Sequence, residues 1–509
     1  GLRYEFDIPR WELQNRFSYW DLNASAPISV PGYTLKGVYK FVGNGQSPFD
    51  KDMNNFAPRL GIAYALNSKT SIRTGAGIFY TLSRATVSGH TGSPFNTNST
   101  PTWSLDSNAT RYITLSNPYP QGLTLPLGSS LGDATFMGLG AGTILRNTAQ
   151  NPELYQWNFS IQREVGFGSL LEVNYLGSRG AKLTNAASTG LANLNPIYWL
   201  NPGNGAQYTR QQLQAAVPNP FYGIITNPLA TNMRNPTIQF YRLLRPMMQF
   251  DGASSSELGN GDSSYQSLQV KWEKRFSHGF QMLAHYTWSK MLDDVSNGSG
   301  NLDWLSNSNG RYLQNLWDYS QEKSYSSNDV PHRLVITGVY QLPVGQGRQW
   351  MNHVNRWVDG VVGGWEISAF YTRQSSQPLQ VTQNGGTLWN GTQRPNLIGD
   401  PSTSGSVYSR MGQWFNTAAF SQPAADTYGS APRFLNYRGP LLDTLDASIA
   451  KSWKVTEAQR VEFRMEASNF RNHPIFNPPA TAYGSSSFGQ ITSTKVGSRN
   501  IQLSLKYYF

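Results

Sequence analysis

Six histidines are the side chains of this sequence best suited to metal binding or acid–base chemistry: His90, His278, His285, His332, His353 and His473. Zinc proteases place two histidines in an HExxH pattern on one helix face, and none of these histidines has that or another metal-ligand spacing. His285 is expected on the inward side of a strand, where hydrogen-bonded histidines are more common than metal ligands. We therefore predict no metal site.

Two glycine-rich stretches superficially resemble ligand-binding loops. Gly138–Thr143, "GLGAGT", lacks the strand-then-helix context of a phosphate-binding loop. Asp293–Gly300, "DDVSNGSG", resembles a calcium loop, but counting back from Gly298 places Val295 where an oxygen ligand is required. No ordered set of Ser, His and Asp residues indicates a nucleophile. The sequence predicts no catalytic residue and no cofactor, so we do not expect an enzyme.

Composition excludes further classes of protein. The 509 residues contain no cysteine, which rules out disulfides and thiolate metal sites. The net charge of +11 could indicate a nucleic-acid partner, but the Lys and Arg residues are scattered and form no stripe, so we predict none. No apolar run approaches the roughly 18 residues of a membrane-spanning helix. A transmembrane barrel would escape this test, because its apolar residues alternate with polar ones.

Such alternation recurs along the chain. In "YQWNFSIQREV", Tyr155, Trp157, Phe159 and Ile161 alternate with polar residues, and a period of two with aromatic and β-branched side chains indicates half-buried strands. We predict about a dozen strands, most of them near the 9–11 residues of a tilted membrane-crossing strand. They lie near 1–8, 58–66, 70–82, 154–165, 169–179, 265–276, 279–291, 332–342, 363–375, 442–455, 459–470 and 498–509. A short capped helix is expected within Thr209–Val217.

The connections between these strands alternate in length. Short ones are Asn67–Lys69, Gly166–Gly168, Ser277–Gly279 and Thr456–Ala458, with 343–362 intermediate. Long ones run near 83–153, 180–264, 292–331, 376–441 and 471–497. Short turns on one rim and long loops on the other are typical of outer-membrane barrels, and a soluble sandwich or propeller does not readily explain them.

The two faces of the predicted strands differ in kind. The apolar faces carry Trp157, Trp272, Trp288 and Trp453, which suit interfacial aromatic girdles. The opposite faces carry charges of both signs, as in Arg460–Glu466, which suit a wet lumen. The predicted fold is therefore an all-β, antiparallel transmembrane β-barrel with long extracellular loops and mostly short periplasmic turns.

Several phrases together resemble the Oar-like family of TonB-dependent outer-membrane transporters of Gram-negative bacteria. They are "FAPRLGIAYAL" (Phe56–Leu66), "NPELYQWNFSIQRE" (Asn151–Glu164), "EVNYLGSRGAKL" (Glu172–Leu183), "VPNPFYG" (Val217–Gly223), "HYTWSKMLDD" (His285–Asp294), "DVPHRLVITGVYQLPVG" (Asp329–Gly345), "EASNFRNHPIFNPP" (Glu466–Pro479) and the final "LKYYF". Within one of them, His332 and Arg333 are expected to begin a strand and to point to opposite faces.

The resemblance implies a receptor that imports a scarce nutrient, such as a glycan, a peptide or a metal chelate. Family members carry an N-terminal regulatory-type β-sandwich, a TonB box and a plug inside a barrel of about 22 strands. We expect residues 1–509 to be a single, truncated barrel domain, the C-terminal half, without these three parts. The ligand-contacting residues are unknown and are expected in the loops near 83–153, 180–264, 292–331 and 376–441.

The implied location is the bacterial outer membrane. The implied partners are its lipid and lipopolysaccharide, the barrel assembly machinery, a TonB-type energy complex acting through the missing N-terminal part, and an extracellular small molecule. The resemblance also implies an assembly signal in the last strand, which has Ile501, Leu503, Leu505, Tyr507 and Phe509 on one side. Two alternatives remain open: a complete smaller passive porin, and a surface β-protein that only binds ligands through its loops.

Overall fold

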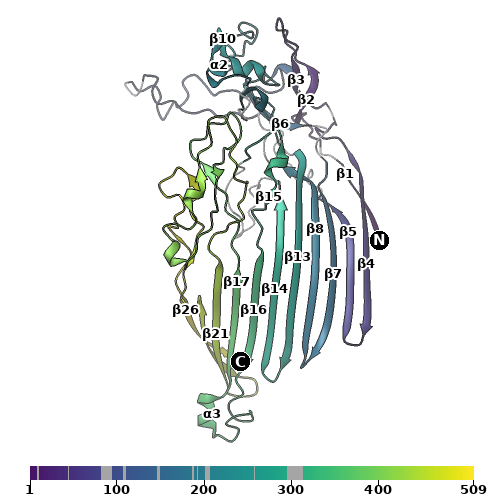
Figure 1. The fold of residues 1–509 in the computed structure, drawn as a ribbon, viewed down its shortest axis with the longest axis vertical. Coiled ribbons are helices and arrows are strands. Elements are labelled where there is room, and N and C mark those ends of the chain that lie inside the picture. Colours follow the sequence, from purple (N-terminus) through teal and green to yellow (C-terminus); the bar gives the residue numbers. More distant parts are fainter. Residues whose placement is uncertain are drawn as a thin grey trace.

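In the computed structural model, one large sheet dominates the molecule (Figure 1). The structure describes all residues except 9–10, 44, 82–93, 107–109, 146–149, 186–188, 192, 201–206, 228, 257 and 295–312. Twelve described strands follow one another across this sheet, each antiparallel to the next. They are β1 (Leu2–Asp7), β4 (Asp52–Asn67), β5 (Thr70–Tyr80), β7 (Glu153–Gly166), β8 (Ser169–Asn185), β13 (Leu258–Ser277), β14 (Phe280–Asp293), β16 (His332–Gln341), β17 (Trp365–Gln374), β21 (Leu442–Lys454), β22 (Arg460–Ser468) and β26 (Asn500–Tyr508).

Each of the twelve predicted strands corresponds to one of these, which confirms the fold class. The predicted bounds were wrong at three ends, because β4 begins at Asp52, β13 begins at Leu258 and β8 continues to Asn185. These extensions break the apolar–polar alternation and are held by pairing instead. The start of β4 pairs with β1, and the extensions of β8 and β13 pair with each other through bulges.

The sheet is open in the described residues. β1 pairs with β4 on one side, β26 pairs with β22 on one side, and neither pairs with the other. The two edges therefore present backbone amide and carbonyl groups without strand partners.

Register places the alternating side chains on two distinct faces. The apolar face, which carries Phe159, Trp272, Trp288 and Leu503, leaves these side chains 43–64% exposed. The polar face carries the residues between them, including Lys271, Glu462 and Arg464. Trp157 lies directly opposite Gly177, and a Cβ at Gly177 would come within 2.3 Å of the indole ring. Glycine is required there because the ring occupies the space of a side chain.

Short turns gather at one end of the sheet. Two of them are two-residue turns, Phe167–Gly168 and His278–Gly279, in which both residues have φ between 50° and 77°. Two positive φ values define the type I′ turn, whose twist matches that of the flanking strands. The intermediate connection lies at the same end as these turns and contains helix α3 (Arg356–Val362), which the alternation pattern did not predict (Figure 1).

Long connections at the other end fold into two packed units. The first loop cap contains a five-stranded mixed sheet of β2 (Ser18–Ser25), β3 (Lys36–Phe41), β6 (Gly140–Leu145), β9 (Thr189–Gly190) and β12 (Gly252–Ser256). It also contains α1 (Pro196–Trp199), α2 (Arg210–Gln214), β10 (Ala216–Pro218), β11 (Thr237–Gln239), and the 3₁₀ helices η2 (Gly132–Ala134) and η3 (Phe240–Leu244). Thr209 caps α2 with a full capping box, which confirms the predicted short helix.

The second loop cap is built from the β14–β16 connection, the β17–β21 connection and the β22–β26 connection. Its strands are β15 (Ser324–Tyr325), β18 (Thr382–Gln383), β19 (Asn396–Leu397), β20 (Phe420–Ser421), β23 (Ile475–Phe476), β24 (Ala482–Tyr483) and β25 (Thr494–Val496), and its 3₁₀ helices are η5 (Tyr319–Glu322), η6 (Tyr408–Arg410) and η7 (Thr417–Ala419). Trp414, Phe415 and Phe420 form the centre of its buried apolar cluster. The long loops are therefore packed structures with cores of their own.

In the described residues the helices are short, and none has the length and apolar composition of a membrane-spanning helix.

Candidate functional site

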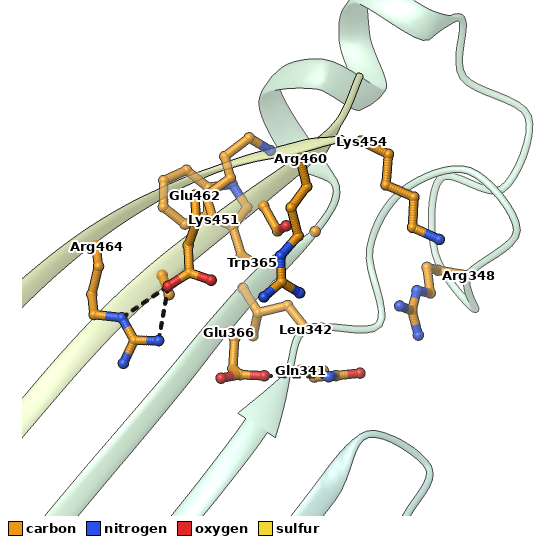
Figure 2. A pocket seen from close by; sticks show the side chains of 13 residues that line it. Gln341, Leu342, Arg348, Trp365, Glu366, Lys451, Lys454, Arg460, Glu462 and Arg464 are labelled. Atoms are coloured by element: carbon orange, nitrogen blue, oxygen red, sulfur yellow. Dashed lines mark hydrogen bonds and ion pairs between the residues drawn. The ribbon is translucent and has the colours of Figure 1, made fainter. Parts of the chain in front are cut away.

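A charged pocket on the polar face, at the short-turn end, is the candidate site (Figure 2). It has a volume of about 340 Å³. β16 contributes Gln341, β17 contributes Glu366, and the β21–β22 hairpin contributes the charged residues Lys454, Arg460, Glu462 and Arg464. Strand alternation positions these side chains. Residues two apart along one strand lie on the same face of the sheet, as do residues directly opposite each other on neighbouring strands.

Part of this charge is neutralised within the pocket. Arg464 binds the Oε1 atom of Glu462 through Nη2 at 2.9 Å and through Nε at 3.2 Å. A second carboxylate, Glu466, lies 3.6 Å from Arg464 Nη1. Gln341 donates to Glu366 at 3.2 Å. These contacts fix the two carboxylates that line the pocket, and with them the position of Arg464.

Three further cations line the same pocket without a carboxylate partner among the described residues. Arg460 has its guanidinium 4.1 Å from the centroid of the Tyr508 ring, a cation–π contact with the last strand. Arg348 comes from the connection before α3, and Figure 2 shows the Lys454 side chain extending toward it. The positive surplus suits an anionic group, because basic side chains in a concave site attract and hold negative charge.

Lys451 lines the edge of this pocket but belongs to the apolar face. It lies opposite Trp365 and Phe463, is 2% exposed, and donates to the carbonyl of Gly363. Its ammonium lies 5.1 Å and 5.3 Å from the rings of Trp365 and Trp453. The α3 connection thus covers a cation that lies on the apolar face of the sheet.

The predicted ligand loops are joined to one another by ion pairs, two of which are buried. Arg394 binds Glu322 at 2.6 Å, with side chains 4% and 0% exposed, and Arg433 binds Asp293 with both side chains nearly inaccessible. Arg210 of the first loop cap binds Asp426 of the second. The two caps are therefore held in one arrangement by contacts between residues distant in sequence.

Burial also raises the pKa of two groups in the second cap. Desolvation, reinforced by the negative charge of Glu322, raises the pKa of Tyr319 to about 12. Burial raises the pKa of the Asp294 carboxyl, which lies just after β14.

The histidines are dispersed. His278 lies in a turn, His332 begins β16, and His285 lies on the polar face of β14 opposite Lys271. His90 and the Val295–Gly300 part of the calcium-like stretch lie outside the described residues. Among the described residues, no group of three or more metal-ligating side chains is arranged to bind a metal ion.

Strand β16 bears out the expectation for its first two residues. His332 lies opposite Trp288 on the apolar face, and Arg333 lies opposite Thr287 on the polar face. The Nδ1 atom of His332 forms a hydrogen bond of 2.8 Å with the Tyr286 hydroxyl. The "GLGAGT" stretch runs into β6, a strand of the first loop cap.

The last strand also has the predicted arrangement. Its five alternating apolar residues are all exposed on one face: Ile501, Leu503, Leu505, Tyr507 and Phe509. Their role as an assembly signal stays a prediction.

Sequence reasoning missed Arg348 of the charged pocket, because this residue lies in a connection without periodicity and only the fold brings it to the β21–β22 hairpin.

An apolar outer face, a polar inner face, short turns at one end and long loops at the other define an outer-membrane β-barrel. Residues 1–502 match the family described as the outer membrane beta barrel domain, and the chain belongs to this family. It is a family of membrane barrels and not of enzymes, and its location is the outer membrane.

Solved structures show a distant likeness. The outer membrane transporter YddB from Escherichia coli matches with a TM-score of 0.41 and 9% identity, over 93% of this chain and 43% of that chain. The ferripyoverdine receptor of Pseudomonas aeruginosa matches with a TM-score of 0.36 and 10% identity, over 93% of this chain and 35% of that chain.

The FrpB iron transporter from Neisseria meningitidis matches with a TM-score of 0.35 and 8% identity, over 93% of this chain and 42% of that chain. The chain therefore spans less than half the length of these structures. Comparison with curated protein sequences gave no match.

Proposed function

We propose that residues 1–509 form the C-terminal barrel portion of an Oar-like, TonB-dependent outer-membrane transporter that imports a glycan, a peptide or a metal chelate. In this proposal the remaining wall of the barrel, a plug and the TonB contact come from other parts of the protein. The sequence phrases that resemble the family, from Phe56–Leu66 to the final "LKYYF", support the assignment.

The observation that carries the proposal is the open edge of the sheet. β1 and β26 do not pair with each other among the described residues. A bilayer cannot hydrogen-bond free strand edges, so a stable membrane barrel requires further strands between them. This favours the larger transporter barrel over a passive porin of a dozen strands.

The loop caps supply the second support. They present exposed aromatic side chains, including Tyr222, Trp317 and Tyr408, which are 44–61% exposed. Aromatic rings beside hydrogen-bonding side chains suit sugars, peptides and chelates. Because ion pairs within and between the caps hold the loops in place, the ligand would meet a preorganised surface, which lowers the entropy cost of binding.

The charged pocket supplies a third support. Its surplus of cations lies on the polar face at the short-turn end, which would face a plug inside the barrel. In this proposal the cations contact acidic groups of that plug. A porin lumen could also carry such charges, so the pocket supports the proposal only together with the open edge.

Energy dependence of uptake tests the proposal. Cells expressing the full-length protein would be given labelled oligosaccharides, peptides and ferric chelates, with and without a protonophore. A TonB-dependent importer binds its ligand in both conditions but accumulates it only when energised. Accumulation that survives the protonophore would indicate a porin, and surface binding without accumulation would indicate a protein that only binds ligands.

A further inference from the structure

A crevice on the apolar face, at the long-loop end of the sheet, is separate from the charged pocket. It has a volume of about 480 Å³, within the range of small-molecule sites of about 300–1,000 Å³. Tyr175, Leu268 and Trp288 line it from three adjacent strands, and Tyr325 of β15 lines its upper part.

These side chains lie on the face that meets lipid. Leu268 is directly opposite both Tyr175 and Trp288, so the three project to the same side of the sheet. They are 37–57% exposed. Tyr and Trp concentrate where the hydrocarbon layer meets the headgroups, which places this crevice at the outer boundary of the membrane.

Two cations, Lys290 and Arg438, line the crevice at its end nearer the long loops. Lys290 follows Trp288 by two residues on β14 and therefore lies on the same face, closer to the loops. Its ammonium is 5.4 Å from the centroid of the Tyr325 ring, and among the described residues it has no carboxylate partner. Arg438 lies on the same tyrosine, 5.5 Å from its centroid, and binds Asp329.

We propose that this crevice binds one molecule of the outer-leaflet glycolipid, lipopolysaccharide, through its lipid A part. An acyl chain lies along Leu268 and Trp288, and a lipid A phosphate lies at Lys290. The apolar floor and the cation above it match the two ends of an anionic lipid, which is the charge complementarity that favours this occupant. The inference depends on the membrane location and on the outward orientation of the long loops, and it is independent of transport.

The side of the membrane distinguishes lipopolysaccharide from phospholipid. Lipopolysaccharide occupies the outer leaflet, which the long-loop end contacts, whereas phospholipid occupies the inner leaflet. Arg163 offers a matched control, because it is an exposed cation on the same apolar face, opposite Thr70 at the short-turn end.

The test uses the full-length protein in detergent and measures bound lipid A by native mass spectrometry. Lys290→Gln should lower lipid A occupancy by about tenfold, the effect of losing one charge-assisted hydrogen bond, whereas Arg163→Gln should leave it unchanged. Leu268→Trp, which fills the crevice without adding charge, should also lower it. Lipid A without phosphate groups should bind equally to the native protein and to Lys290→Gln.

Several results would overturn the proposal. Unchanged lipid A occupancy in both Lys290→Gln and Leu268→Trp would exclude the crevice. An equal loss in Arg163→Gln would indicate diffuse electrostatic attraction. Tighter binding of phosphatidylglycerol than of lipid A would make the site a phospholipid site.

Discussion

Arg394 donates from Nη1 to the Oε2 atom of Glu322 across 2.6 Å, and both side chains are almost completely buried. The residues belong to different long connections and are 72 positions apart. Glu322 also accepts backbone hydrogen bonds from Gln314 at 2.9 Å and Asn315 at 3.2 Å. The pair thus fixes one long connection against another, and its charges have almost no access to solvent.

Removing one partner should therefore loosen the second loop cap. Arg394→Ala leaves an uncompensated buried carboxylate, which typically costs about 3–5 kcal/mol. Hydrogen exchange should show faster opening of backbone amides in 376–441, measured in the full-length protein. Arg16→Ala removes the surface ion pair with Glu12, in which the Arg16 side chain is 41% exposed, and should leave stability almost unchanged because surface ion pairs contribute little. Equal exchange in the two variants would contradict a structural role for the buried pair.

The apolar face should tolerate charge poorly. Ile161, 41% exposed near the middle of β7, points to the proposed lipid side. Ile161→Arg should lower the free energy of unfolding in lipid by about 2–4 kcal/mol if it lies near the midplane of the bilayer. Gln162→Arg, one residue further on the polar face, should have little effect. Equal sensitivity at both positions, measured by denaturant unfolding in vesicles, would indicate a sheet buried on two sides.

Orientation can be tested with two epitope tags. One is inserted after Gly122, in a turn within the long β5–β7 connection, and the other after Phe167, which is 95% exposed in the β7–β8 turn. Antibody should label intact cells only with the first tag, because long loops face outward and short turns face the periplasm. Labelling of the second tag alone on intact cells would reverse the topology.

The terminal aromatic should contribute to assembly. Phe509 is 94% exposed, and its ring lies 5.9 Å from that of Tyr507 on the apolar face of β26. In the full-length protein, deleting Phe509 or adding a charged C-terminal tag should lower outer-membrane insertion and leave protein in the periplasm. Phe167→Ser removes an equally exposed aromatic elsewhere and should insert normally. Normal insertion of both Phe509 variants, measured by membrane fractionation, would remove the assembly role.

The charged pocket should affect transport more than ligand capture. Arg460→Glu reverses a charge on the polar face, far from the loop caps, so uptake of the ligand should fall while its binding to whole cells is retained. Arg111→Glu reverses an exposed charge in a long connection and serves as the control. If Arg460→Glu leaves energised uptake unchanged, the pocket has no part in transport.

The sequence by itself determined the twelve strands of the large sheet and the side to which each side chain points. Alternation is local and has a period of two, so a stretch such as Tyr155–Val165 specifies both its strand and its apolar face. Two-residue turns such as His278–Gly279 then fix the register of each hairpin. The residues of the terminal strand could be identified for the same reason.

Tertiary structure alone decided the loop caps and the composition of the charged pocket. Arg433 and Asp293 meet across 140 positions, and β6 pairs with β12 in parallel across more than a hundred residues. Short, irregular segments carry no periodic signal, and their partners are chosen by burial, which requires every buried charge and backbone group to find a neighbour. Arg348 lines the same pocket as Arg460 for the same reason. Its connection has no periodicity, and the packing of the α3 segment against the end of the sheet decides where Arg348 lies.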